Sequence, residues 1–197
     1  MSRLRFTPRQ QNNFITVAAV LGWVGLTIQL YIILSMRLAE GTPLMPGLIN
    51  FLSFFTVLTN TLAAIVLTCR VTPSARRLRG YFLRPAISTG ITANMLLVGI
   101  AYSLLLRHLW TPEGWQFVAD ELLHDVMPLA FLAYWLLAVE KGTLRLWHIF
   151  GWMLYPLVYL GYALLRGKIA AVYQYPFLSV PQPVSYTHLT LPTKRIV

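Results

Sequence analysis

The sequence predicts an all-α fold, a polytopic bundle of transmembrane helices. Hydrophobic residues make up 57% of the 197-residue chain and charged residues 11%, whereas a soluble domain carries about 25% charged residues. Five apolar runs are each long enough for a helix to cross the bilayer, at about 20 residues per span. Backbone groups in lipid must be paired within the protein, and continuous apolar runs favour helices over a barrel.

The spans follow in order from apolar runs separated by connections rich in glycine, proline and charge. The first run follows a basic, polar N-terminal segment. It is too long for a signal-peptide core and lacks a small-residue cleavage site, so we expect a retained span. The five spans are expected at residues 14–36, 47–69, 85–106, 122–139 and 146–165.

The C-terminal segment 184–197 departs from the composition of everything before it. Residues 184–193 can be back-translated into bases that resemble a transposase adapter used to prepare sequencing libraries. The continuation of that adapter supplies Val197 and a stop codon. We therefore expect a single integral membrane domain over residues 1–183 and a non-native tail at 184–197. The native sequence that would follow residue 183 is then missing.

The distribution of lysine and arginine predicts an N-terminus in the cytoplasm. With that orientation ten basic residues lie in the inner segments and four in the outer ones. We expect a multi-pass protein of the plasma membrane. The inner set is Arg3, Arg5, Arg9, Arg70, Arg76, Arg77, Arg79, Arg84, Lys141 and Arg145, and the outer set is Arg37, Arg107, Arg166 and Lys168.

Composition argues against several other classes of protein. The formal charge of +10 would suit a nucleic-acid partner, but the arginines lie between apolar runs, where membrane topology requires them. The lone Cys69 gives neither an internal disulfide nor a zinc or iron–sulfur ligand set. We expect no cofactor and no metal, and membrane lipid as the surrounding partner; protein partners are not indicated.

Polar residues recur inside two spans. On a continuous helix, Ser53, Thr56 and Asn60 would share one face. Such residues commonly pack transmembrane helices together, and that is the simpler interpretation. The third span repeats the pattern with Ser88, Thr89, Thr92 and Asn94, where we expect packing alone.

His124 opens the fourth span, with Asp120 four residues earlier and Glu121 three residues earlier. A carboxylate at that spacing can orient an imidazole and stabilise its charged form. A histidine at the membrane interface beside solvated acids is the alternative. On a straight second span Thr56 would lie roughly 13 Å from the start at Gly47, deeper than His124.

Three short motifs resemble one known family: "FFTVLTN" at 54–60, "HDVMP" at 124–128 and "YQYPFL" at 173–178. The chain resembles the androgen-induced-gene-like (FAR-17a type) membrane proteins, in their bacterial Pr-six-Pr branch. The resemblance implies six spans, so a sixth would be lost with the C-terminal truncation. It also implies hydrolysis of fatty-acid esters of hydroxy fatty acids by a threonine nucleophile and a histidine, at Thr56 and His124.

The chemistry would be acyl transfer at a lipid ester. His124 would act as base for Thr56, and Asp120 or Glu121 would orient the imidazole. Asn60 or Ser53 could donate a hydrogen bond to the developing oxyanion.

Other readings stay open at this point. One is a non-enzymatic membrane scaffold or regulator, in which the polar residues only pack. A transporter would need charges buried in mid-span or an inverted repeat, and the sequence has neither. A b-type haem protein could use His108 and His124, which are both expected on the outer side.

Overall fold

The structure, a computed structural model, describes residues 7–170 and 174–175. Every regular element in those residues is helical. The chain divides into two compact units, residues 1–160 and 161–197, and the last helix crosses their boundary. The expected tail at 184–197 and most of the motif at 173–178 lie outside the described residues.

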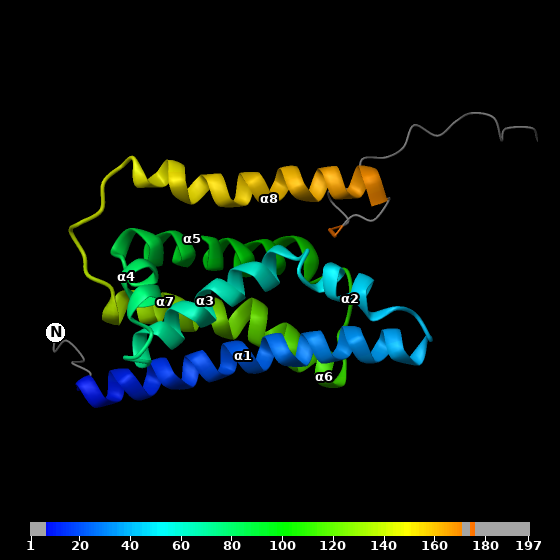
Figure 1. The fold of residues 1–197 in the computed structure, drawn as a ribbon, viewed down its shortest axis with the longest axis horizontal. Helices are drawn as coiled ribbons and strands as arrows, with labels where there is room; N and C mark the ends of the chain where they lie inside the picture. The colour runs from blue at the N-terminus through cyan, green and yellow to red at the C-terminus, as the bar shows by residue number, and fades with distance from the viewer. Residues whose placement is uncertain (1–6, 171–173, 176–197) are drawn as a thin grey trace, which may run out of the picture. The chain divides into compact units, whose positions relative to one another are not determined.

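Four helical segments of the described chain are long and apolar enough to cross a membrane. The predicted all-helical bundle is therefore confirmed, with wider limits for most spans (Figure 1). The α-helices α5 and α7 are joined to short π-helical turns, η1 and η2, which lengthen their spans. These segments are α1 (Pro8–Ala39), α5 (Pro85–Ala101) with η1 (Tyr102–Leu106), α6 (Gly114–Glu121) with η2 (Leu122–Val126) and α7 (Met127–Ala138), and α8 (His148–Ala170).

The second span is broken, which corrects the prediction of a single helix over 47–69. It consists of α2 (Leu44–Phe51) and α3 (Phe55–Val71), bent by 72° at the intervening residues. At the break the Ser53 hydroxyl donates to the carbonyl of Ile49 at 2.6 Å, and Phe54 takes an extended conformation. A serine that bonds its own backbone competes with helix continuation. Counting the bent pair as one span gives five.

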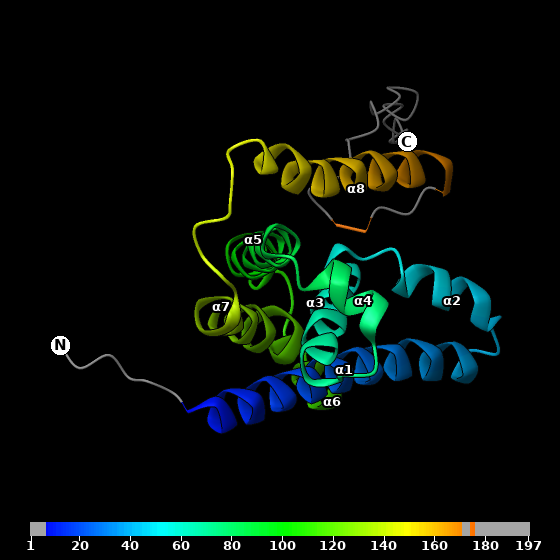
Figure 2. The same ribbon diagram turned by 60° about the vertical axis from the view of Figure 1, so that its left-hand side comes forward.

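The helix α3 supplies much of the core of the first unit, where it packs against α1 and α5 (Figure 2). Its residues Ala63, Ala64, Val66 and Leu67 are fully buried. Close approach depends on small residues: a Cβ added at Gly22 would lie 2.8 Å from Met127 Cε. Small side chains of this kind allow membrane helices to pack without voids.

A short helix, α4 (Arg76–Phe82), occupies the arginine-rich connection that was expected to be a loop. Arg79 Nη1 donates to the carbonyl of Cys69 at 2.7 Å, at the end of α3. A cation there satisfies unpaired carbonyls and interacts favourably with the helix dipole. The connection is thereby fixed to the helix that precedes it.

Candidate functional site

Thr56 differs from the other threonines of α3 because of its place in the helix. Thr59, Thr61 and Thr68 each donate their hydroxyl to the carbonyl four residues earlier, all at 2.7 Å. Thr56 is the second residue of α3, so the carbonyl four residues before it lies outside the helix. Its Oγ1 lies 3.3 Å from Nε2 of His124. The structure thus brings these two side chains within hydrogen-bond distance.

The surroundings of His124 fix the direction of that hydrogen bond. Its Nδ1 lies 3.0 Å from the carbonyl oxygen of Asp120 and 3.2 Å from Oδ1 of the same residue. Both are acceptors, so Nδ1 carries the hydrogen, and Nε2 of the neutral ring is an acceptor. The Thr56 hydroxyl therefore donates to His124. This is the arrangement that a general base needs before it removes a proton.

A proline explains the local helix geometry around His124, which lies in the π-helical turn η2. Pro128 follows four residues later, lacks an N–H, and would clash with the His124 carbonyl in a regular α-helix. A widened turn avoids that clash, and such turns are frequent at functional sites. Gly99 allows α5 to approach this carbonyl, since a Cβ there would lie 3.1 Å from it.

Asp120 connects His124 to a third helix. Its side chain is buried, with 3% exposed, and its Oδ2 accepts a hydrogen bond from the Tyr102 hydroxyl. The Tyr102 ring also stacks on the imidazole, with centroids 3.9 Å apart and planes 17° from parallel. Tyr102 therefore contacts both Asp120 and His124. Sequence reasoning missed it because it lies on another helix, with no local spacing that relates it to His124.

Arg107 closes the outer edge of this cluster. It donates to Asp125, lies 3.5 Å from Glu121, and its guanidinium is 5.2 Å from the centre of the Tyr102 ring. The hydrogen bond to Asp125 raises the pKa of Arg107. Of the two acids expected to orient His124, Asp120 contacts it, whereas Glu121 pairs with Arg107.

Asn60 and Ser53 do not occupy the positions expected for oxyanion donors. Asn60 Nδ2 donates to the carbonyls of Thr56 at 2.9 Å and Leu123 at 3.0 Å, which fixes α3 to η2. Both amide hydrogens are thus already in use. Ser53 precedes α3, so it does not share a helical face with Thr56 and Asn60. For Ser53 the reason is the helix break, which sequence periodicity could not reveal.

The start of α3 offers a different set of donors. The first N–H groups of any helix lack intrahelical acceptors, and together they carry a partial positive charge. Among the residues that the structure describes, the N-cap position of α3 is Phe54, whose side chain makes no capping hydrogen bond. The backbone N–H groups of Thr56 and Val57 thus belong to the positive end of the helix that carries the hydroxyl.

Within the described residues, no group of three or more histidine, cysteine, aspartate or glutamate side chains could hold a metal ion. No protein-family model, curated protein or solved structure matches the chain. The roles of Thr56 and His124 therefore depend on the geometry of this cluster and on the resemblance described above.

Proposed function

We propose that this protein, whose apolar helices suit a multi-pass membrane protein, is an intramembrane hydrolase of lipid esters. Thr56 is the nucleophile, His124 the general base and Asp120 the residue that orients the base. The observation that supports this most strongly is the continuous series of hydrogen bonds from Thr56 through His124 to Asp120 and Tyr102. Packing alone does not require a hydroxyl to donate to an oriented imidazole.

The reaction follows the usual sequence of acyl transfer. Thr56 Oγ1 attacks the ester carbonyl carbon while its proton passes to His124 Nε2. The tetrahedral intermediate collapses, the C–O bond to the alcohol breaks, and the alcohol leaves with the proton from Nε2. A water molecule, deprotonated by His124 Nε2, then attacks the acyl carbon; the bond from that carbon to Thr56 Oγ1 breaks, Oγ1 takes the proton back from Nε2, and the carboxylic acid is released.

The developing oxyanion would be stabilised by the N-terminus of α3. Its unpaired backbone N–H groups and its dipole favour negative charge at this point. The buried Asp120 stabilises the imidazolium formed when Thr56 loses its proton. The Tyr102 hydroxyl holds the second carboxylate oxygen and so limits rotation of Asp120.

The substrate class follows from the surroundings of the cluster. Thr56 is buried, with 8% exposed, and lies at one end of an apolar helix; a substrate that reaches it from within the bilayer is an ester carried by a lipid. The asymmetry of the basic residues supports an N-terminus in the cytoplasm. We propose that the protein lies in the plasma membrane, and with this orientation the cluster lies towards the outer face. Cysteines introduced at Arg77 and Gly114, in a Cys69→Ala background, should react from inside and outside respectively with an impermeant thiol reagent.

Labelling with a lipophilic fluorophosphonate tests the hydrolase proposal. The full chain in membranes should be labelled, and Thr56→Ala and His124→Ala should each abolish labelling without lowering expression. The double variant should be no worse than either single one, because the two residues act as a unit. Thr59→Ala is the matched control, since its hydroxyl bonds the Phe55 carbonyl and Tyr155.

The competing function is a membrane scaffold or regulator in which the cluster only joins helices. Absence of labelling in the wild-type chain would favour it. Equal loss of labelling in Thr59→Ala and Thr56→Ala would do the same, because a general packing defect would then explain both.

A further inference from the structure

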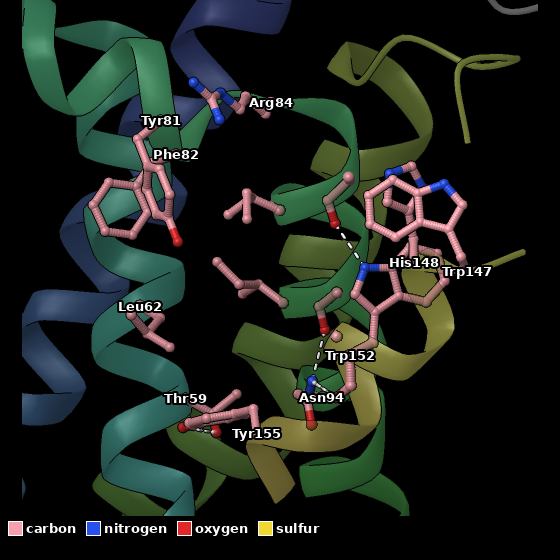
Figure 3. A pocket seen from close by; sticks show the side chains of 15 residues that line it. Thr59, Leu62, Tyr81, Phe82, Arg84, Asn94, Trp147, His148, Trp152 and Tyr155 are labelled. Atoms are coloured by element: carbon pink, nitrogen blue, oxygen red, sulfur yellow. Dashed lines mark hydrogen bonds between the residues drawn. The ribbon is translucent and has the colours of Figure 1, made fainter. Parts of the chain in front are cut away.

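A cavity of about 780 Å³ lies among α3, α4, α5 and the first half of α8 (Figure 3). All of its lining residues belong to the unit formed by residues 1–160, and neither Thr56 nor His124 is among them. Small-molecule sites in proteins typically enclose about 300–1,000 Å³. The cavity therefore has the size of a binding site, separate from the proposed catalytic cluster.

Two side chains with hydrogen-bond donors line the cavity from different sides, Arg84 beside Tyr81 and His148 beside Trp147 (Figure 3). Arg84 Nε donates to the carbonyl of Gly80 at 3.0 Å, which leaves the two terminal amino groups of the guanidinium for another acceptor. His148 Nδ1 accepts the backbone N–H of Arg145 at 3.0 Å. The neutral imidazole therefore carries its hydrogen on Nε2 and presents a donor there.

An aromatic residue lies beside each of these donors. Tyr81 and Trp147 are each more than half exposed and lie near Arg84 and His148 respectively. Tyrosine and tryptophan favour the headgroup level of a bilayer, where one end of the ring is wet and the other apolar. The donors of Arg84 and His148 are thus at the depth where lipid headgroups lie.

The rest of the cavity has apolar walls and a floor whose polar groups are already paired. Ile87 and Ile91 of α5 line the walls. On the floor, Thr59 Oγ1 donates to the Phe55 carbonyl and lies 3.1 Å from the Tyr155 hydroxyl, while Asn94 Nδ2 donates to the Gly90 carbonyl at 2.8 Å. A hydrocarbon chain can therefore fill this part without leaving those donors unpaired.

The connections at this end of the helices are strongly basic. Within the described residues they carry seven basic side chains from Arg70 to Arg145 and a single acid, Glu140. Such a surface attracts anionic headgroups, by about 1 kcal/mol for each basic residue close to the membrane. The seven are Arg70, Arg76, Arg77, Arg79, Arg84, Lys141 and Arg145.

We propose that this cavity binds an anionic phospholipid. The phosphate lies against Arg84, the ester oxygens of the same lipid lie against His148, and one acyl chain extends between α5 and α8 along Ile87 and Ile91. A free phosphate would use the donors but leave the apolar part empty, whereas a lipid matches both. This proposal does not depend on the hydrolase function, because its residues and the cluster at Thr56 are different.

Native mass spectrometry of the purified full chain tests the proposal. The chain is mixed with micelles containing phosphatidylglycerol or phosphatidylcholine of the same acyl composition, and the retained lipid is counted. We expect phosphatidylglycerol to be retained over phosphatidylcholine, and Arg84→Gln to lower its affinity about tenfold. Arg77→Gln removes the same charge from α4 without touching the cavity, so it should leave retention nearly unchanged.

A second pair of variants tests the acyl part of the site. Ile87→Trp should fill the space and lower retention, whereas Leu97→Trp, at a position 45% exposed on the same helix, should not. His148→Phe tests the headgroup contact again if Arg84→Gln does not fold. Equal retention of the two lipids, equal loss in Arg84→Gln and Arg77→Gln, or displacement of the lipid by inorganic phosphate would each overturn the proposal.

Discussion

The helices α3 and α5 contain similar polar residues, but the hydroxyl of Thr56 in α3 bonds a different partner from the threonine hydroxyls of α5. In α5, Thr89 donates to the Pro85 carbonyl at 2.7 Å, Thr92 to the Ser88 carbonyl at 2.8 Å, and Asn94 to the Gly90 carbonyl. These donors are satisfied by their own helix. In α3, Thr56 instead donates to an imidazole on a different segment of the chain.

The difference arises from helix position rather than composition. A threonine in a helix interior has a carbonyl four residues earlier within reach, and its hydroxyl bonds there. The break between α2 and α3 removes that carbonyl for Thr56. The same break also places Thr56 at the end of α3 instead of deep within a continuous span. The depth difference expected between Thr56 and His124 is therefore absent.

Among variants that keep both Thr56 and His124, the largest effect should come from Asp120→Asn, which tests whether the Thr56 hydroxyl belongs to a catalytic series. An amide can donate to His124 Nδ1 and favour the wrong tautomer, so Nε2 would no longer accept from Thr56. We expect the rate of fluorophosphonate labelling to fall about 10⁴-fold, as for loss of an orienting carboxylate in related chemistry.

Asp125→Asn is the matched control for this variant. Asp125 lies in the same helical segment but bonds Arg107 rather than the imidazole. Labelling should fall by much less. An equal loss in both variants would mean that general charge, and not the orientation of His124, sets the reactivity of Thr56.

A smaller effect is expected from Tyr102→Phe. The variant keeps the ring that stacks on His124 but removes the hydroxyl that bonds Asp120. Loss of one hydrogen bond to a charged group, at about 1.5–3 kcal/mol, should slow labelling by tenfold or more. Tyr134→Phe removes a hydroxyl from a residue 2% exposed elsewhere in the core, and labelling should then be unchanged. Similar losses in both variants would assign Tyr102 a packing role.

Hydropathy predicted the spans because each span needs a long apolar surface. The third span, for example, was expected at 85–106 and is observed at Pro85–Leu106. It could not locate the break at 52–54, where the sequence remains apolar. The break lies where Phe54 takes an extended conformation, a local backbone feature that does not change the average hydropathy.

The candidate site was predictable in part for a similar reason. The pairing of Asp120 with His124 follows from their spacing along one helical segment, and the structure has it at 3.2 Å. Partners on other helices depend on how the helices pack, so spacing did not indicate Tyr102. The same limit explains why Ser53 was grouped with Thr56, although the two lie on opposite sides of a bend.

The smallest effects should come from the hydroxyls of α5. Thr92→Val keeps the shape of the side chain and removes a hydrogen bond to its own helix. The free energy of unfolding in detergent should therefore fall by about 0.6 kcal/mol. Thr89→Val should lower the free energy of unfolding further, by about 1–3 kcal/mol. Thr89 Oγ1 also accepts from Trp135 Nε1 at 2.8 Å, and the indole would lose that acceptor. Neither variant should change fluorophosphonate labelling. If either one slowed labelling as much as Thr56→Ala, the hydroxyls of α3 and α5 would be equivalent, and Thr56 would join helices as the others do.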